Sequence, residues 1–252
     1  MEYTRLSETV KIKKVSENNT EGVFEIEGLY TGFGLTIGNA LRRVLLSSIP
    51  GAAITQVKIK NVKHEFSTID GVLEDVVEIV LNLKKTRFKF FAEEPQVLTI
   101  DVKGEKEVTA GDIKVNAQVE VMNPESHIAT LTSKKSEFSM ELTVEKGLGY
   151  VPVEARKADK LPVGVIAIDA IFTPVTKVNF TIENMRVGEK TDYNRLKLFI
   201  ETDGTISPSA VLHKSSNILK DHFDKISMIE VSAENEPAKK EEKKETKKKA
   251  KK

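Results

Sequence analysis

The 252-residue sequence predicts an α+β fold, in which three helices accompany a larger number of short, mainly antiparallel strands. Two observations lead to this prediction. Apolar residues recur at helical spacing in only three segments. Elsewhere, short runs of β-branched and aromatic residues alternate with Gly, Pro, Asn and Asp. This second pattern is typical of antiparallel pairing and not of repeated strand–helix–strand units.

The first predicted helix, from about residue 36 to residue 48, has two different faces. At 100° per residue its apolar side chains share one side, and Pro50 ends the helix. The opposite side carries Asn39, Arg43 and Leu46. An arginine beside an aliphatic residue suits a protein interface, because Arg can make bidentate charge-assisted bonds. The alternative is an ordinary surface arginine beside a partly buried leucine.

A glycine-rich segment, Gly32-Phe33-Gly34-Leu35-Thr36-Ile37-Gly38, follows a predicted strand and opens this helix. Two interpretations are open. The backbone N–H groups of such a loop can cradle the phosphates of a dinucleotide. Alternatively, the glycines allow a tight turn and close helix packing. The looser G-x-G-x-x-x-G spacing and the lack of repeated strand–helix units favour the second interpretation.

The second predicted helix, residues 70–83, begins with Asp70 as its N-cap. Its predicted buried stripe consists of Val72, Leu73, Val76, Val77, Val80 and Leu83. The acidic residues Glu74, Asp75 and Glu78 fall on the other side, which we interpret as a solvated face.

The third predicted helix, residues 208–228, begins after Ser207, with Pro208 at its first position. The remaining chain predicts eleven strands, at residues 11–15, 23–27, 54–62, 87–91, 97–102, 115–122, 128–132, 137–144, 164–172, 177–183 and 196–202.

Composition argues against several classes of function. The chain has no cysteine, which excludes disulfides, Cys-ligated metals and a thiolate nucleophile. Its four histidines are not spaced as a metal-binding pair. No seryl nucleophile motif or P-loop is present, and no apolar stretch approaches the length of a membrane-spanning helix. We therefore expect a cytoplasmic protein with no catalytic residues and no metal of its own.

The net charge of +1 divides unevenly along the chain. Residues 232–252 contain nine Lys and five Glu, a net charge of +4, and the remainder has a net charge of −3. The tail has no large apolar residue, so it cannot offset the entropy of ordering. We predict a disordered Lys/Glu-rich tail. Its role is either to keep the chain in solution or to make a weak, sequence-independent contact to DNA.

Five blocks of the sequence strongly resemble, in order, the N-terminal region of the alpha subunit of bacterial RNA polymerase. They are GLYTGFGLTIGNALRRVLLSSIPGAAITQVKI, HEFSTIDGVLEDVVEIVLNLK, KGLGYVPVEARK, LPVGVIAIDAIFTPVTKVNFTIE and KTDYNRLKLFIETDGTISPSAVLHKSSNILKDHF. The resemblance covers about residues 5–230, and the Gly-Asn-Ala-Leu-Arg-Arg segment is its most specific part.

The resemblance implies a role in assembly and no active site in this chain. Alpha subunits of this family form a homodimer, which recruits the beta subunit and then the beta-prime subunit for DNA-templated transcription. The catalytic magnesium is expected in those partner subunits. The implied organisation is a discontinuous dimerisation domain at residues 1–50 and 171–231, interrupted by a mainly antiparallel β domain inserted at residues 51–170.

The resemblance also implies site residues. Arg43 matches the helix arginine that contacts beta in the family. Partner contacts further include Leu46, Lys84 and, facing beta-prime, Lys190, Thr191 and Asp192. The two outer helices supply the implied dimer core, whose candidate residues are Ile37, Leu41, Leu45, Leu219, Phe223 and Ile226. The family usually continues into a C-terminal DNA-binding domain, in place of which this sequence has the Lys/Glu-rich tail. DNA contact is therefore expected through the whole complex.

Overall fold

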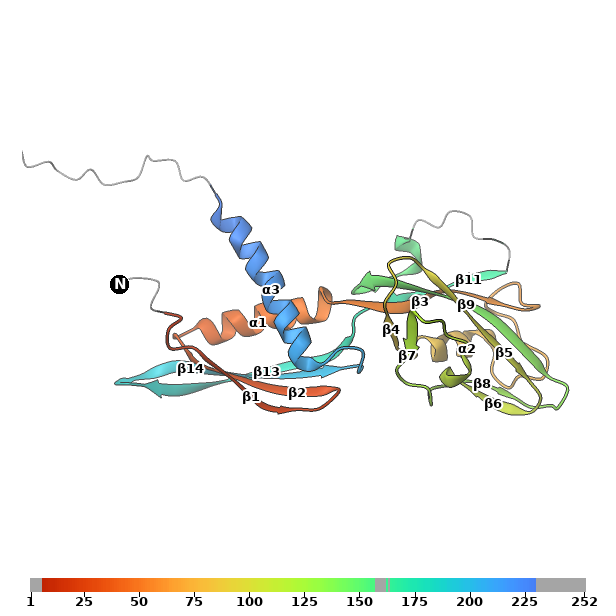
Figure 1. Cartoon of the computed structure of the whole chain (residues 1–252), viewed down its shortest axis with the longest axis horizontal. Helices are drawn as coiled ribbons and strands as arrows, with labels where there is room; N and C mark the ends of the chain where they lie inside the picture. Colours follow the sequence, from red (N-terminus) through yellow and green to blue (C-terminus); the bar gives the residue numbers. More distant parts are fainter. Residues whose placement is uncertain (1–5, 157–161, 163, 230–252) are drawn as a thin grey trace, which may run out of the picture.

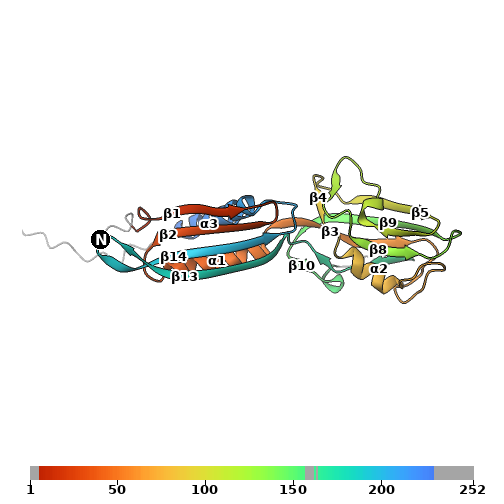
Figure 2. The same ribbon diagram turned by 90° about the horizontal axis from the view of Figure 1, so that it is seen from below.

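The computed structural model describes residues 6–156, 162 and 164–229, so the tail predicted at residues 232–252 lies outside the described part. Two hydrophobic cores divide the described chain. One draws its buried residues from positions 24–49 and 175–211, and the other from positions 52–168. The elements around these cores lie end to end along the long axis of the molecule (Figures 1 and 2). The fold is α+β, as the sequence predicts.

Segments from both ends of the chain form one antiparallel sheet, in the order β1-β2-β14-β13. Its strands are β1 (Lys11–Glu17), β2 (Glu21–Leu29), β13 (Val175–Val187) and β14 (Lys190–Thr202). The last two are longer than the sequence predicts, because they continue into a hairpin that turns at Gly188 with a positive φ of 62°. Alternate residues along β14, among them Leu196, Leu198 and Ile200, are buried under the helices.

Helix α1 (Phe33–Ser47) lies unusually close to this sheet because glycines form its inner face. A Cβ atom on Gly38 would lie 2.9 Å from Cε2 of Phe180, and one on Gly34 would lie 3.0 Å from Cβ of Asn194. Leu41 and Leu45 continue the inner face and are fully buried. The first helix thus has the buried side that its periodicity predicts, and the glycines are part of it.

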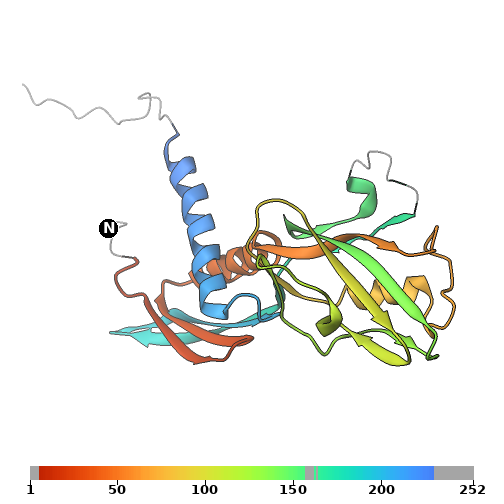
Figure 3. The same cartoon turned by 45° about the vertical axis from the view of Figure 1, so that its right-hand side comes forward.

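Helix α3 (Pro208–Ser227) lies on the same face of the sheet as α1. It crosses α1 and then rises away from the sheet (Figures 2 and 3). Pro208, Val211 and Ser215 are buried, and all belong to the first half of the helix. Gly22 makes this approach possible, since a Cβ there would lie 2.6 Å from Cβ of Pro208. The second half of the helix projects beyond the sheet, which leaves residues 220–227 exposed.

The second core lies inside a set of antiparallel sheets. The main sheet has the order β11-β3-β9-β5, where β3 is Pro50–Ile59, β5 is Gln96–Lys103, β9 is Glu137–Leu148 and β11 is Val165–Ala167. Three two-stranded sheets complete it, namely β4 (Phe88–Phe90) with β7 (Val119–Val121), β6 (Lys106–Thr109) with β8 (His127–Leu131), and β10 (Tyr150–Val151) with β12 (Ala170–Ile171). Two short 3-10 helices, Ala110–Asp112 and Val153–Ala155, join these strands.

Several sequence predictions in this part are wrong. The strand predicted at residues 164–172 is two strands, β11 and β12, which pair with different partners. The strand predicted at 115–122 is reduced to β7, and strands β6 and β10 were not predicted. Each missed strand is four residues or shorter, and such a segment is too short to establish a hydrophobic alternation of its own.

Helix α2 (Val76–Leu83) is shorter than predicted. Its N-cap is Asp75, whose carboxylate accepts a hydrogen bond from the N–H of Glu78, and not Asp70. The preceding residues run beside β8, where Val72 bridges to Leu131 and the N–H of Leu73 donates to the carbonyl of Thr130. Two residues of the predicted buried stripe therefore lie outside the helix.

The junction between the two parts is filled by Phe172, which forms a small third core with Ala53 and Ala170. Two glycines make room for it. A Cβ on Gly147 would lie 2.6 Å from the Phe172 ring, and Gly51 lies directly against the Phe172 backbone. The start of β3, the end of β9 and the return segment to β13 therefore pack together where the two parts meet.

Replacing Gly38 by alanine tests the close seating of α1. In an exposed helix interior this change stabilises a protein by about 1 kcal/mol. Here the added methyl would collide with Phe180, so we expect the free energy of unfolding to fall by roughly 1–3 kcal/mol. Chemical denaturation followed by circular dichroism measures the change. The matched control is Asn39→Ala on the exposed side, which should be neutral or stabilising. A Gly38→Ala protein as stable as the parent would contradict this packing.

Candidate functional site

The outward face of α1 is one candidate contact surface. Asn39, Arg43 and Leu46 are all exposed there, as the sequence predicts. In the described part of the chain, the Arg43 guanidinium has no ion pair or hydrogen bond, so it can bind a carboxylate of another molecule without first breaking a bond. Because the opposite face is anchored by glycine contacts, this arginine stands on a rigid support.

The second half of α3 is another candidate surface. Phe223 is 62% exposed and Ile226 is 66% exposed. Met228 and Ile229, which follow the end of the helix, are also largely exposed. Large apolar side chains that gather at the end of a projecting helix are typical of a protein interface, because a monomer gains nothing from exposing them together.

An open groove lies near the N-terminal end of α1. It has a volume of about 380 Å³ and is almost entirely apolar, and its lining residues are Leu6, Ser7, Val10, Leu29, Tyr30, Phe33 and Ile37. Ile37, which belongs to the predicted dimer set, therefore lines a surface groove. The groove combines the segment before β1, the end of β2 and the first turn of α1, so only the folded sheet brings its walls together.

The other predicted dimer residues differ in how deeply they are buried within their own chain. Leu41 and Leu45 are 4% and 0% exposed, and they fill the core between α1 and the sheet of the same chain. Leu219 is partly buried against that core. Ile37, Leu219, Phe223 and Ile226 are thus the members of the set with accessible surface. Leu41 and Leu45 instead hold α1 in place.

Asn194, on β14, fixes the N-terminus of α1. Its Oδ1 accepts hydrogen bonds from the N–H groups of Gly32 at 2.9 Å and Gly34 at 3.4 Å. These are the donors that a phosphate would need, so a dinucleotide could bind only by displacing Asn194. Gly32 has a positive φ of 85°, as its turn requires. The glycines therefore serve a tight turn and close packing, which is the second of the two interpretations above.

Glu17, at the end of β1, fixes the N-terminus of α3. Its Oε1 accepts a hydrogen bond of 2.8 Å from the N–H of Ser209, and its Oε2 pairs with Lys14 at 2.8 Å. The Lys14 ammonium and the Ser209 donors lower the pKa of Glu17 to about 2. A carboxylate at this position also complements the positive end of the helix dipole. Glu17 thus orients the helix whose far end carries the exposed apolar residues.

Lys84, a predicted partner contact, is held within its own chain. Its Nζ lies 3.0 Å from Oδ2 of Asp169, and Oδ1 of the same carboxylate accepts a hydrogen bond from the N–H of Val153. The pKa of Asp169 is lowered, mainly by the Val153 N–H and then by Lys84. Lys84 therefore ties the end of α2 to the β11–β12 turn, and only part of its side chain remains exposed.

The predicted contact segment Lys190, Thr191 and Asp192 begins β14 and lies beside the loop before α1. The hydroxyl of Thr31 donates to Oδ2 of Asp192 at 2.7 Å. The Lys190 ammonium lies 5.9 Å from the centre of the Tyr30 ring. The structure thus brings this segment next to the wall of the apolar groove, although about 160 residues separate the two in sequence.

Phe66 and Leu73 are exposed residues that the sequence did not single out as contacts. They lie in the segment between β3 and α2 and are 81% and 72% exposed. Leu73 was instead predicted to be buried in a helix. Asn194 and Glu17 were also missed. Asn194 left a detectable signal, because it occupies an inward-facing position in register with Leu196.

No three His, Asp or Glu side chains in residues 6–156, 162 and 164–229 are grouped so that they could hold a metal ion. The helices in this part of the chain are all too short or too polar to cross a bilayer.

Comparison with known proteins identifies the family. The model of the RNA polymerase Rpb3/RpoA insert domain matches residues 57–173. The chain is 46% identical to the DNA-directed RNA polymerase subunit alpha of Alkaliphilus oremlandii, and the match covers 92% of this chain and 75% of that protein. The proteins of the same name from Oceanobacillus iheyensis and Symbiobacterium thermophilum are 48% and 50% identical, over 92% and 86% of this chain and 76% and 69% of their own lengths. The chain belongs to the RNA polymerase alpha-subunit family.

Within this alpha-subunit family fold, the insert-domain match coincides with the part built around the second core, from β3 to β12. The helix with Arg43 and the apolar end of α3 both lie outside the matched residues. The candidate surfaces are therefore distributed over the whole chain and are not confined to the insert.

Glu17→Gln should weaken the attachment of α3. We expect this change to lower the free energy of unfolding by about 0.5–2 kcal/mol at pH 6, because the cap and its charge are lost. Since the pKa of Glu17 is lowered from 4.5 to about 2, the carboxylate stabilises the fold above pH 4.5, and this contribution is lost as the pH falls through about 2. The difference in unfolding free energy between the two proteins should therefore shrink as the pH falls below 4.5, and should vanish only near pH 2. Glu21→Gln, at an exposed carboxylate nearby, is the control. A difference that does not depend on pH would refute the ionic cap.

Proposed function

We propose that this chain is the alpha subunit of a DNA-directed RNA polymerase and works as a homodimeric assembly scaffold. It recruits the beta and beta-prime subunits for DNA-templated transcription and contributes no catalytic residue. The observation that carries the proposal is the second half of α3, which presents Phe223 and Ile226 to solvent on a chain that belongs to the alpha-subunit family.

The dimer forms by exchange of the two apolar surfaces. The end of α3 from one copy, with Phe223 and Ile226, docks against the groove beside Ile37 and Phe33 of the other copy. A two-fold axis repeats this contact, so each copy gives one helix end and one groove and the assembly closes at two chains. The contact removes from water the apolar side chains that the protomer cannot cover.

The beta subunit binds the outward face of α1. Arg43 supplies a bidentate donor for a carboxylate, and Leu46 supplies adjacent apolar surface. Phe66 and Leu73 extend this contact on the insert, where they are the most exposed large apolar residues before α2. Lys84 contributes by shaping the surface while it remains paired with Asp169.

The beta-prime subunit binds the second copy, with Lys190, Thr191 and Asp192 as its nearest candidates. A symmetric dimer presents each surface twice, so the first subunit to bind makes the two copies unequal. The catalytic magnesium belongs to these partners, and DNA is reached through the complete complex in the cytoplasm. The basic tail, residues 232–252, adds a weak contact to DNA.

Reconstitution of the complex tests the proposed function. We expect a tagged chain, co-expressed with beta and beta-prime subunits from the same genome, to purify with both in a ratio of two copies to one of each. The complex should extend RNA on a DNA template, and the chain alone should not. Recovery of the chain without either subunit would refute the scaffold role.

Phe223→Glu and Ile226→Glu should separate the dimer without unfolding the protomer, because both side chains are exposed in a single chain. Placing a carboxylate in the apolar contact costs well over 1.4 kcal/mol, so we expect the dimer dissociation constant to rise by more than tenfold. Sedimentation velocity over a concentration series measures this constant. Lys220→Glu, at an exposed position on the same helix, should leave it unchanged. An unaltered dimer in both apolar variants would disprove the docking of α3.

Arg43→Ala should leave the dimer intact and strongly weaken capture of the beta subunit. Loss of a central arginine anchor typically costs about 2 kcal/mol or more, which corresponds to a roughly thirtyfold weaker complex. Binding of purified beta subunit to immobilised dimer provides the measurement. Arg42→Ala, at the neighbouring exposed arginine, is the matched control. If both variants bind beta as tightly as the parent, α1 does not provide this contact.

A further inference from the structure

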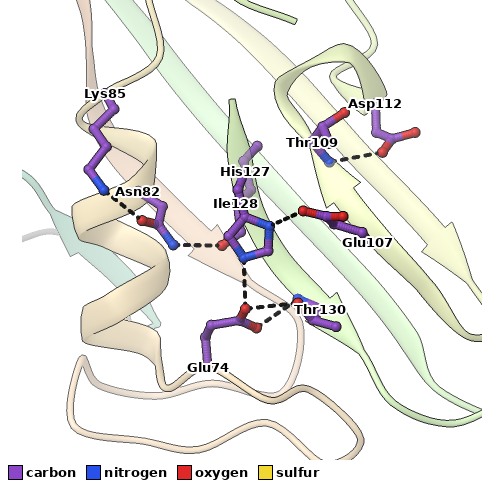
Figure 4. A network of polar contacts seen from close by, with 9 residues as sticks. All are labelled: Glu74, Asn82, Lys85, Glu107, Thr109, Asp112, His127, Ile128 and Thr130. Atoms are coloured by element: carbon purple, nitrogen blue, oxygen red, sulfur yellow. Dashed lines mark hydrogen bonds and ion pairs between the residues drawn. The ribbon is translucent and has the colours of Figure 1, made fainter. Parts of the chain in front are cut away.

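His127 lies between two carboxylates that belong to different segments of the insert. Its Nε2 lies 2.7 Å from Oε1 of Glu74, which precedes the N-cap of α2, and its Nδ1 lies 2.9 Å from Oε1 of Glu107 on β6. Figure 4 shows the ring standing on β8 with one nitrogen directed at each carboxylate. The three side chains therefore connect the segment before α2 with the two-stranded β6–β8 sheet.

This geometry determines the protonation state of the ring. A neutral imidazole has one N–H donor and one acceptor nitrogen, whereas an imidazolium has two donors. An ionised carboxylate can only accept. Both contacts are therefore hydrogen bonds at the same time only when His127 is doubly protonated. In either neutral tautomer, one carboxylate faces a lone pair.

Glu74 depends on this donor more than Glu107 does. The Glu74 side chain is largely buried, and it also accepts hydrogen bonds from the N–H of Thr130 at 2.6 Å and from its hydroxyl at 3.0 Å. Burial alone would raise the pKa of Glu74, but the Thr130 N–H and His127 outweigh it, so the pKa is lowered. Burial likewise opposes the charge on His127, and Glu74 and Glu107 overcome it and raise the pKa of His127.

The other charged groups around the ring are already engaged. Lys106, next to Glu107 on β6, pairs with Asp112. Lys85, at the end of α2, donates to Asn82, whose amide in turn donates to the carbonyl of Ile128 (Figure 4). On the α2 side, Asp75 accepts the N–H of Glu78 as the helix cap. In this part of the described structure, His127 is thus the cation that faces both Glu74 and Glu107.

We propose that His127 is a positioning residue that acts as an imidazolium and fastens the segment between β3 and α2 to the two-stranded β6–β8 sheet. The segment, residues 60–75, presents Phe66 and Leu73 on the surface. Its backbone bonds to β8 persist without the ring, but Glu74 then loses one of its donors in a buried position. Deprotonation of His127 therefore loosens the segment locally and leaves the fold intact.

The direction of the pH effect follows from the raised pKa. Protonated His127 contributes its full stabilisation below pH 6.5, which is the ordinary pKa of histidine. This contribution is lost as the pH rises through the higher pKa of His127 in the folded state. Each further pH unit reduces the imidazolium population about tenfold. Glu74 sets the opposite limit, because its protonation in acid removes the same contact. The segment is therefore most firmly held between these two titrations.

Histidine-selective NMR on the full chain tests the proposal directly, because there are only four histidine signals to assign. We expect His127 in the parent protein to titrate above 6.5, and we expect Glu74→Gln to lower this pKa toward the ordinary value. Glu107→Gln keeps the contact between His127 and Glu74, so it should lower the pKa of His127 by a smaller amount. A His127 that titrates at or below 6.5 in the parent would overturn the proposal.

Hydrogen exchange supplies the second readout, after correction for intrinsic exchange rates. From pH 7 to pH 9 we expect the protection of residues 60–75 and of the Thr130 N–H to fall by up to about tenfold per pH unit above the pKa of His127. In His127→Gln, protection should be low at both pH values. His213→Gln, on α3, is the control and should behave as the parent. Equal pH dependence in the parent and in His127→Gln would disprove the role of the imidazolium.

Discussion

The close seating of α1 on β13 and β14 is the contact on which the other surfaces of this molecule depend. Gly34 and Gly38 allow it, and Asn194 completes it by capping the helix from the sheet. With its inner face fixed, α1 cannot rotate, so Arg43 stays on the outward face. The chain passes from this helix through buried Ile49 directly into β3, and the seating of α1 therefore also sets where the insert begins.

A difference in length explains why the fold is left with an apolar end. Helix α3 has 20 residues and is about 30 Å long, whereas its buried residues end at Ser215. Glu17 and Pro208 anchor its beginning, so the helix cannot slide to bury its far end. Each large apolar side chain left exposed forgoes about 1.5–3 kcal/mol of burial. A second copy can recover this energy without any change in the protomer, which favours a preformed dimer surface over a folding-coupled one.

The sequence predicted the two outer helices well, because their apolar periodicity persists over three or more turns and Pro residues mark their limits. It failed at α2, where Val72 and Leu73 continue the helical pattern but lie along β8. Apolar spacing alone cannot distinguish a first helical turn from a segment that lies along a strand, since the neighbouring strand overrides the local helical preference. The periodicity that predicted α1 also predicted the exposure of Arg43 and Leu46, because the face opposite a buried stripe must be exposed.

The contacts that hold the surfaces in place could not be predicted from local pattern. Asn194 acts on Gly32, Glu17 on Ser209 and His127 on Glu74, so each pair joins residues more than fifty positions apart. Their residue types are ordinary for a strand end or a turn. Only the topology, which pairs β2 with β14 and places β8 beside α2, turns them into helix caps and a bridging cation.

Arg43 and Lys84 illustrate how the same kind of charge can serve different purposes on one chain. Lys84 already has a carboxylate partner in Asp169, so a second protein that bound Lys84 would have to take the ammonium from this partly buried carboxylate or share it. Arg43 has no carboxylate partner within the described residues, and its planar donors suit a carboxylate on another protein. Energetically, the free arginine on the rigid helix is suited to anchor a partner, while the paired lysine is suited to keep the end of α2 in register with the β11–β12 turn. Contact positions inferred from family resemblance are thus of two physical kinds, and the internal pairing of each side chain separates them.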